Sequence, residues 1–338
     1  MAMRQRVSIV GDGAMGTLCA ILLAENGVSV RLWSAFAEAA DELARTRVNR
    51  RFLPGHRLPE SVEVTGRDEL ALEGAGLIVS AVPAQFARAV WQRLRAHCPA
   101  GVPVCSVTKG IENKTLLRPT EVIADALGAG GGAPRPMAAL SGPSIAPEVA
   151  DRHPATVTVA CGQTALARRV QELLSGPCFR VYTNTDVVGV EVAGATKNVV
   201  AIAAGILDGL SAGYNAKAAL LTRGLVEITR LGSAMGARAE TFAGLAGMGD
   251  LVTTCFCPIG RNRSLGEAIG GGRTLRQALE ATESVVEGVA TTESVVELAA
   301  RHGVEMPITQ AVHSVLFEGV RPADAIADLM ARPLKAER

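Results

Sequence analysis

Strand-like and helix-like stretches alternate through the first half of the chain, and this alternation most limits the fold. A short apolar strand, Arg6–Val10, is followed by a helical stretch over 14–26 that ends at Gly27, a usual helix stop. Further strands are predicted at 28–33, 62–64, 76–82, 102–107, 137–141, 155–160 and 179–182, and further helices at 37–45, 85–97, 120–127 and 165–174. Such an alternation is typical of a parallel sheet with helices on both faces.

The first strand and the first helix are joined by Gly11-Asp12-Gly13-Ala14-Met15-Gly16, which fits the pattern G-x-G-x-x-G. A strand before this pattern and a helix after it indicate a dinucleotide site. Gly11 permits the tight turn, Gly13 lets a pyrophosphate approach the backbone, and Gly16 lets the helix pack closely on the strand. The free amides of the helix N-terminus suit the phosphates. A purely structural glycine turn is the alternative.

The choice of cofactor depends on the end of the second strand. NAD sites tend to carry an acid there and NADP sites a base, but Arg31-Leu32-Trp33-Ser34-Ala35-Phe36 has no acid at its end. Three arginines in the following loop are candidates for binding a 2′-phosphate, with a solvated charge cluster as the alternative: Arg47, Arg50 and Arg51. The sequence predicts NAD or NADP as cofactor, with a weak preference for NADP.

Strand signals stop near residue 186, and helical periodicity takes over. Helices are predicted at 187–210, 216–236, 264–270, 274–281, 290–302, 308–318 and 322–330. A chain of 338 residues is long enough for two domains. We therefore predict a Rossmann-like α/β dinucleotide-binding domain over 1–185 and an all-α substrate and catalytic domain over 186–338.

The stretch 187–210 is almost entirely small and apolar, with Lys197 and Asn198 at its centre. A buried lysine is rare unless it is paired or has a function, because burial disfavours its charged form. Small residues share its helix face, so a cofactor or another backbone has room to approach the amine. The alternative is a structural lysine that reaches solvent or a distant carboxylate. Because Glu191, Lys197 and Asn198 interrupt the apolar run, a buried core helix is favoured over a membrane span.

Four further stretches carry more polar chemistry than packing requires. Lys109 and the segment Ser141-Gly142-Pro143-Ser144 each follow a predicted strand, where ligands gather in open α/β sheets. A glycine-rich turn over 244–249 ends in Asp250, and Arg261-Asn262-Arg263 suits a bidentate phosphate contact. Each has a plain structural alternative, but together they favour a small phosphorylated substrate.

Composition excludes several other classes of function. The net charge is +1, from 34 basic and 33 acidic side chains, so neither nucleic acid nor a membrane surface is expected as a partner. The seven cysteines are scattered, and Cys255 and Cys257 lack a second pair at zinc-ligand spacing, so we expect reduced thiols and no metal. The N-terminus runs straight into a strand without a signal peptide, which favours the cytoplasm.

A series of segments extends over nearly the whole chain: GDGAMGT, RFLPG, VTKGIE, LSGPS, GATKNVVAI, DGL, NAKAALLTRGL, RLG, TFAGLAGMGDLVTTC, GRNR, VVEG and EMPI. In these segments and their order the chain resembles the bacterial-type NAD(P)-dependent glycerol-3-phosphate dehydrogenases. The resemblance implies reversible reduction of dihydroxyacetone phosphate by NAD(P)H to sn-glycerol 3-phosphate, and a role in supplying glycerophospholipid synthesis. The family often forms homodimers, which the apolar helical half would accommodate.

The resemblance also implies roles for individual residues. The family's proton donor and acceptor falls on Lys197, and Lys109 and Asp250 complete the predicted catalytic set. With the glycine turn, the predicted cofactor contacts are Gly11, Gly13, Ala14, Met15, Gly16, Lys109, Ala146, Arg261, Val285 and Glu287. The predicted substrate contacts are Lys109, Gly142, Ser144, Lys197, Asn198, Asp250, Thr254, Gly260, Arg261 and Asn262.

Five positions depart from the residues usual in that family. Ala14 and Met15 stand where a serine and an aromatic residue are usual, and Ala35 where an arginine or histidine is usual. Ile145 replaces a phenylalanine and Gly260 a serine. These departures leave two alternatives: a related reductase of another small keto acid or hydroxy compound, and a homologue that binds NADP(H) without turnover.

Overall fold

The computed structural model describes residues 6–128, 134–282, 284–334 and 336–337. Contacts within the chain divide it into two compact units. The first comprises Met1–Gly110 and Leu117–Glu191, and the second comprises Ile111–Leu116 and Val192–Arg338. This division falls a few residues after the predicted boundary at 185 and also assigns the short segment Ile111–Leu116 to the second unit.

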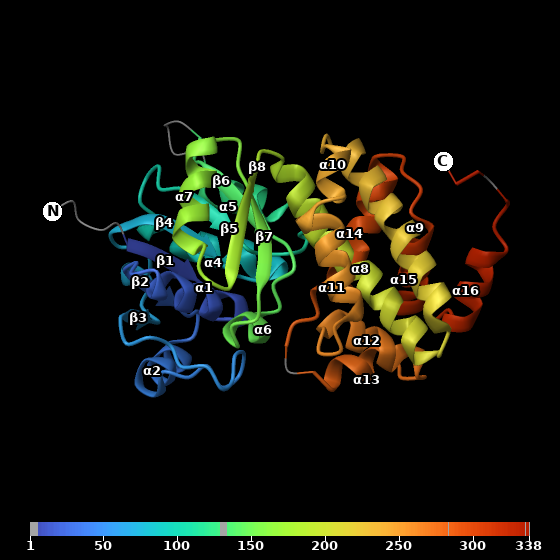
Figure 1. Cartoon of the computed structure of the whole chain (residues 1–338), viewed down its shortest axis with the longest axis horizontal. Helices are drawn as coiled ribbons and strands as arrows, with labels where there is room; N and C mark the ends of the chain where they lie inside the picture. Colours follow the sequence, from blue (N-terminus) through green and yellow to red (C-terminus); the bar gives the residue numbers. More distant parts are fainter. Residues whose placement is uncertain (1–5, 129–133, 283, 335, 338) are drawn as a thin grey trace. The chain divides into compact units, whose positions relative to one another are not determined.

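The first unit contains, among the described residues, an eight-stranded sheet in the order β3-β2-β1-β4-β5-β6-β7-β8 (Figure 1). Its strands are β1 (Arg6–Val10), β2 (Val30–Trp33), β3 (Val62–Thr65), β4 (Ala75–Ser80), β5 (Val104–Ser106), β6 (Met137–Ser141), β7 (Ala155–Ala160) and β8 (Phe179–Asn184). The expected parallel pairing holds from β3 to β6, but β7 runs antiparallel to β6. The connection between them holds a five-residue helix, α6 (Ala146–Ala150), whereas a parallel crossover usually needs a full helix.

Helices in the first unit cover the sheet and form its core together with the strands. They are α1 (Ala14–Glu25), α2 (Ala37–Thr46), α3 (Asp68–Ala71), α4 (Ala84–Leu94), α5 (Pro119–Leu127), α6 and α7 (Thr164–Leu174), with a 3₁₀ turn at Arg95–His97. The short helices α3 and α6 were not predicted.

Strand β1 lies between β2 and β4, and Ile9 pairs with Leu32 and Val79. The glycine turn therefore lies at the carboxyl end of a central strand, where ligands of such sheets bind.

The described part of the second unit is helical (Figure 1). Its helices are α8 (Val187–Gly209), which begins in the first unit, α9 (Gly213–Ala234), α10 (Ala239–Phe242), α11 (Asp250–Phe256), α12 (Arg261–Gly270), α13 (Leu275–Glu280), α14 (Glu287–Arg301), α15 (Pro307–Phe317) and α16 (Pro322–Met330). The predicted glycine-rich turn before Asp250 is wrong: Leu245–Gly249 forms a π-helical turn that runs directly into α11. A side chain at Gly247 would overlap the Phe242 backbone, so this glycine serves close packing.

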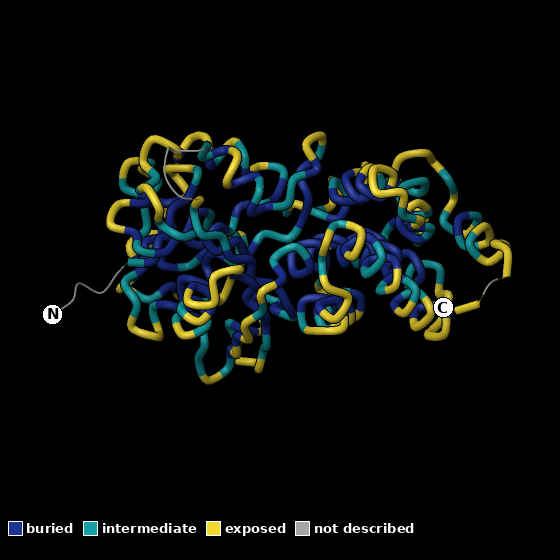
Figure 2. The backbone as a smooth tube through the Cα atoms, turned by 90° about the horizontal axis from the view of Figure 1, so that it is seen from above, coloured by how far each residue is buried: buried dark blue, intermediate teal, exposed yellow. Residues whose placement is uncertain are grey.

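Helix α8 consists mostly of small apolar residues and is buried along most of its length. It is long and apolar enough to cross a membrane, but 89% of its most apolar window is buried inside the protein, as in the core helix of a soluble protein. Its acidic residue Glu191 is buried and accepts hydrogen bonds from Arg118 (2.5 Å) and from the Thr120 backbone N–H (2.8 Å). Figure 2 shows buried residues gathered in the interior of each unit.

Candidate active site

The glycine turn between β1 and α1 has the geometry of a phosphate-binding loop. Gly11 has a φ of 104°, and a Cβ there would lie 2.8 Å from the Ala81 carbonyl oxygen. A Cβ at Gly16 would overlap the Gly11 carbonyl oxygen, whereas a Cβ at Gly13 would point into open space. Among the described residues, no side chain caps the first turn of α1, which begins at Ala14 and Met15. The open position beside uncapped amides fits the pyrophosphate of a dinucleotide.

Two of the four arginines near the end of β2 are engaged in the protein itself. Arg31 is buried and forms an ion pair with Glu63 (2.8 Å). Arg47 is also buried and donates to the backbone carbonyls of Pro59 and Val62. The prediction that Arg47 could reach a 2′-phosphate is therefore wrong, because it ends α2 with a left-handed backbone that turns it into its own loop. Arg50 and Arg51 are exposed.

Asn49 places those two arginines beside the glycine turn. Its side-chain amide donates to the Asp12 carbonyl oxygen (2.6 Å) and to Thr17 Oγ1 (2.8 Å). Its own oxygen accepts from the Phe52 N–H (3.1 Å), which fixes the loop locally. Asn49 was not predicted, because one asparagine in a polar loop carries no signal of where its side chain reaches.

A second group of predicted residues comes together at the ends of β5 and β6. Lys109 Nζ donates to the Gly142 carbonyl oxygen (3.1 Å), and the Ser144 hydroxyl donates to the same oxygen (3.0 Å). Gly142 has a φ of 142°, and a Cβ there would lie 2.8 Å from Val157 Cα, so a side chain does not fit. Ile145 occupies the N-cap position of α6, and Ala146 is the first residue of that helix.

In the second unit, Lys197 of α8 meets two residues of α11. Lys197 is 5% exposed and Asp250 2% exposed, and the two form an ion pair. Lys197 Nζ also donates to Thr254 Oγ1 (2.6 Å), whose hydroxyl in turn donates to the Asp250 carbonyl oxygen (2.7 Å). Asp250 and Thr254 share one helix face because they are four residues apart. The arrangement fixes a buried ammonium group by two oxygen acceptors.

The small residues that follow Lys197 admit the backbone of α12. A Cβ at Gly205 would overlap the Arg263 carbonyl oxygen, and one at Gly266 would overlap the Ile202 carbonyl oxygen. The two helices therefore touch backbone to backbone, as glycine alone permits. This contact brings the first turn of α12, with Arg261 and Asn262, towards the Lys197 segment of α8.

Gly288 of α14 joins these two segments. Its N–H donates to Asn262 Oδ1 (2.9 Å). A Cβ at Gly288 would lie 2.5 Å from that same oxygen and 2.9 Å from the Asn198 carbonyl oxygen. Asn198 and Asn262 are both buried, and they lie next in sequence to Lys197 and Arg261. Gly288 was not predicted, because its role depends on contacts between three helices.

The remaining predicted residues lie at the starts of α12 and α14. Gly260 is the N-cap of α12, and Arg261 is its first residue, exposed and donating to the Val285 carbonyl oxygen (2.8 Å). Glu287 is the first residue of α14, next to Gly288. Lys197, Asn198, Asp250, Thr254 and this α12–α14 set therefore form one group in the second unit.

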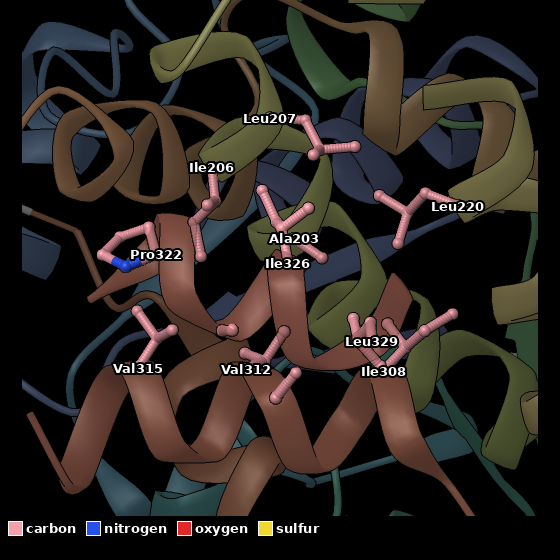
Figure 3. A pocket seen from close by; sticks show the side chains of 12 residues that line it. Ala203, Ile206, Leu207, Leu220, Ile308, Val312, Val315, Pro322, Ile326 and Leu329 are labelled. Atoms are coloured by element: carbon pink, nitrogen blue, oxygen red, sulfur yellow. The ribbon is translucent and has the colours of Figure 1, made fainter. Parts of the chain in front are cut away.

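A separate hollow of about 390 Å³ in the second unit, partly open to solvent, is unsuited to a phosphorylated substrate (Figure 3). It is lined by Ala203, Ile206, Leu207, Leu220, Ile308, Ala311, Val312, Val315, Pro322, Ala325, Ile326 and Leu329. These side chains come from α8, α9, α15 and α16, and all are apolar. A phosphate placed there would lose its hydration without gaining a partner.

Comparison with known proteins identifies the family. Models of the NAD-dependent glycerol-3-phosphate dehydrogenase N-terminus and C-terminus match residues 6–167 and 186–327. The chain is 48% identical to a glycerol-3-phosphate dehydrogenase [NAD(P)+] of Geobacter sulfurreducens, over 99% of this chain and 100% of that protein. It belongs to the NAD-dependent glycerol-3-phosphate dehydrogenase family. The resemblance drawn from the sequence segments is thereby confirmed.

Two further members of the glycerol-3-phosphate dehydrogenase family support this placement. A glycerol-3-phosphate dehydrogenase [NAD(P)+] of Corynebacterium glutamicum strain R is 47% identical over 98% of this chain and 99% of its own. The crystal structure of glycerol-3-phosphate dehydrogenase from Coxiella burnetii matches with a TM-score of 0.92 and 40% identity, over 97% of this chain and 99% of that one. The predicted fold class, a Rossmann-like unit followed by a helical one, is confirmed.

Proposed function

We propose that this chain catalyses the reversible NAD(P)H-dependent reduction of dihydroxyacetone phosphate to sn-glycerol 3-phosphate. It is an oxidoreductase of the glycerol-3-phosphate dehydrogenase family, and its product supplies glycerophospholipid synthesis. The observation that carries the proposal is the buried Lys197, held by Asp250 and Thr254 on a helix that packs backbone to backbone against α12. An ammonium group fixed in this way suits proton transfer to a carbonyl oxygen.

Residues of the first unit are assigned to the cofactor. The uncapped amides of α1 and the open space at Gly13 support binding of the pyrophosphate at the glycine turn. When bound, the nicotinamide cofactor supplies the hydride. Ala14, Met15 and Ala146 are assigned to further cofactor contacts. Lys109 is assigned to both cofactor and substrate. Lys109 and Ser144 both donate to the Gly142 carbonyl oxygen, and these hydrogen bonds hold the three residues together.

Lys197 is assigned the role of proton donor in the reduction. As the ketone carbon is reduced, negative charge develops on its oxygen, and the Lys197 ammonium stabilises that charge and donates a proton to it. Asp250 and Thr254 hold the amine in one position, which removes the cost of ordering a flexible lysine at each turnover. In the reverse direction the neutral amine accepts the proton from the hydroxyl group.

The first turn of α12 is assigned to the substrate phosphate. Arg261 offers a charged fork, and the helix N-terminus after Gly260 offers free amides and a positive partial charge. Asn262 already accepts from Gly288 with its oxygen, so its amide nitrogen is the atom assigned to the substrate. Val285 and Glu287 are assigned to the cofactor at the adjoining start of α14, and Asn198 to the substrate.

The cofactor is NAD or NADP, as the names of the relatives state for those proteins. The preference for NADP remains a prediction. It is supported by the lack of an acid at the end of β2 and by the exposed Arg50 and Arg51 beside the glycine turn. A small phosphorylated substrate is the assigned partner. A homodimer and a cytoplasmic location also remain predictions, and light scattering on the purified protein would test the first of them.

The direct test follows loss of the reduced-nicotinamide absorbance with dihydroxyacetone phosphate, with NADH and NADPH in parallel. We expect turnover. The Arg261→Gln variant should raise KM for the substrate roughly 10- to 100-fold, because a charged hydrogen bond contributes about 1.5–3 kcal/mol. Arg276→Gln, which removes an exposed arginine paired with Glu280, is the matched control and should leave KM unchanged.

Two outcomes would contradict the proposal. Binding of NADPH without turnover of any ketone would support a cofactor-sensing protein instead. Turnover of an uncharged keto compound, with a KM that Arg261→Gln leaves unchanged, would support a related reductase, because a phosphate-binding arginine has no function towards such a substrate.

A further inference from the structure

One further inference concerns how the turn assigned to the substrate phosphate is held, and it rests on the proposed function. We propose that Asp208, near the end of α8, is a positioning residue for that phosphate. Its carboxylate binds Arg263 and thereby fixes the first turn of α12, which carries Arg261 and Asn262.

The first turn of α12 needs an anchor outside its own helix. The N–H groups at the start of a helix have no partner within the helix, and a side chain at the N-cap usually binds one of them. The N-cap of α12 is Gly260, which has no side chain for this purpose. Its free amides suit an anion, but the turn that presents Arg261 must be held in place by other contacts.

Asp208 supplies such a contact through Arg263, the third residue of α12. Arg263 Nε donates to Asp208 Oδ2 (2.7 Å), and the Arg263 side chain is only 13% exposed. The same carboxylate pairs with Lys217 of α9 (2.8 Å), so it lies between two cations. A charge-assisted hydrogen bond that is shielded from solvent is stronger than one on the surface. The bond acts directly on the turn that carries Arg261 and Asn262.

This ion pair fixes a movement that the glycine contacts between α8 and α12 leave free. A Cβ at Gly205 would overlap the Arg263 carbonyl oxygen, so the two backbones touch there. Such van der Waals contacts keep the helices close but have no preferred direction, whereas a hydrogen bond requires a defined distance and angle. The bond from Arg263 to Asp208 therefore sets the rotation of α12 about its axis, and with it the direction in which Arg261 projects.

The same bond separates the roles of the two arginines that flank Asn262. The Arg263 guanidinium pairs with Asp208 and, within α12, with Glu267 (3.2 Å), so two carboxylates balance its charge. Arg261 is exposed and donates to a backbone carbonyl oxygen, which carries no net charge. A phosphate at this turn therefore meets the charge of Arg261, while Arg263 holds the turn.

Steady-state kinetics with dihydroxyacetone phosphate and a saturating reduced cofactor test this role. Asp208→Asn and Arg263→Gln each break the ion pair, so each should raise KM for dihydroxyacetone phosphate about tenfold. Below the melting temperature kcat should stay within a few-fold of the wild-type value, because Lys197 is held by Asp250 and Thr254. A purely structural role would lower the melting temperature without changing KM.

Two further variants serve as the rescue and the matched control. A lysine amine reaches at least as far along the side chain as Arg263 Nε, so Arg263→Lys can keep the ion pair with Asp208 and should hold KM near the wild-type value. Glu267→Gln removes the other partner of the same arginine. That pair lies within α12 and does not tie the helix to α8, so KM should not change.

A double variant shows whether Asp208 acts through the phosphate-binding arginine. In Arg261→Gln the side chain to be positioned is already gone. Adding Asp208→Asn to Arg261→Gln should therefore raise KM by much less than the factor of about ten expected in the wild-type background.

The inference is overturned if Asp208→Asn and Arg263→Gln leave KM unchanged, or if Glu267→Gln or Arg263→Lys raises KM as far as they do. It is also overturned if the effects of Asp208→Asn and Arg261→Gln on KM simply multiply. If Asp208→Asn fails to fold because the buried Lys217 loses its partner, Arg263→Gln takes its place in every comparison, since it leaves the pair of Asp208 and Lys217 intact. A wild-type protein that does not reduce dihydroxyacetone phosphate would instead contradict the proposed function.

Discussion

Two buried lysines of the second unit allow the role of Lys197 to be separated from that of any buried ion pair. Lys197 pairs with Asp250, and Lys217 of α9 pairs with Asp208 (2.8 Å). Both lysines are less than a tenth exposed. Loss of one partner of a buried pair destabilises a fold by about 3–5 kcal/mol, so both substitutions to methionine should lower the melting temperature.

The two variants should differ in catalysis. Lys197→Met removes the proposed proton donor, so kcat should fall by a factor of about 10²–10⁴ while the dissociation constant for NADPH changes little. Lys217→Met should keep kcat within a few-fold below its melting temperature. Steady-state kinetics and fluorescence titration measure both effects. Equal losses of kcat in the two variants would show that Lys197 matters for folding rather than for proton transfer.

Glu227 gives the stability of the protein a pH dependence of its own. It is buried in α9 and accepts hydrogen bonds from the backbone N–H of Ile308 (2.8 Å) and Thr309 (3.3 Å) at the start of α15. Burial raises the pKa of the Glu227 carboxyl group from 4.5 to about 7. Between those values the folded chain holds a proton that the unfolded chain has released. Its contribution to the free energy of unfolding therefore falls as the pH rises from about 4.5 to about 7, by up to ~3 kcal/mol.

Glu227→Gln isolates this contribution, because glutamine does not titrate. Urea unfolding at several pH values gives the free energy of unfolding of both proteins. The wild type should lose stability relative to the variant as the pH rises to about 7, and the difference between them should be constant above that pH. A difference that is independent of pH would mean that Glu227 keeps an ordinary pKa in the folded chain.

Residue types that stand out locally could be predicted, and those defined by distant partners could not. Lys197 was a candidate because a charge inside an apolar helix is conspicuous in the sequence alone. Asn49 and Gly288 gave no such signal, because each acts through a segment remote in sequence. The prediction for Arg47 was wrong because its position in a loop suggested exposure, whereas its left-handed backbone turns the residue inwards.

At the level of elements, α8 and α12 depend on glycines that let their backbones touch. A Cβ at Gly266 would overlap the Ile202 carbonyl oxygen, so Gly266→Ala must push the helices apart. We expect a loss of stability of about 1–3 kcal/mol, as for other overpacked cores, measured by chemical denaturation. KM for the phosphorylated substrate should also rise, because Arg261 begins the same helix.

Gly162→Ala is the control for this prediction. A Cβ at Gly162 meets nothing within 4 Å, so stability should stay within about 0.5 kcal/mol of the wild type and KM should not change. If Gly266→Ala were as harmless as Gly162→Ala, the contact between α8 and α12 would be looser than the structure has it.

Element prediction succeeded where the pattern is long and local. Helix α8 was predicted at 187–210 and spans Val187–Gly209, because its apolar composition continues without interruption by glycine pairs or proline. Helices α10 and α11 were missed, because the glycines over 244–249 suggest a turn, whereas packing on Phe242 makes them part of a π-helical turn. The reversal at β7 was missed because strand direction depends on the length of the connection, which a pattern of strands does not reveal.

For the whole molecule, the change from alternating elements to helices alone was enough to predict the fold class, because each pattern extends over many residues. The order of the strands was not predictable, because it depends on contacts between segments far apart in the chain.

Different residues are proposed to bind the cofactor phosphates and the substrate phosphate, and this has a thermodynamic consequence. Each ligand should stabilise the folded protein through the residues that bind it. A ligand at about 100 times its Kd adds about 2.7 kcal/mol to the free energy of unfolding.

Ligand protection can therefore show which residues bind which ligand without any catalysis. NADPH and sn-glycerol 3-phosphate, each at about 100 times its Kd, should each raise the melting temperature by roughly 3–5 °C. In Arg261→Gln, protection by glycerol 3-phosphate at the same concentration should fall to between about a sixth and a half of the wild-type value, while protection by NADPH should remain close to that of the wild type. Arg276→Gln, on the exposed face of α13, should keep both effects. If Arg261→Gln lost both protections equally, Arg261 would act on the stability of the fold, and the phosphate would have to bind elsewhere.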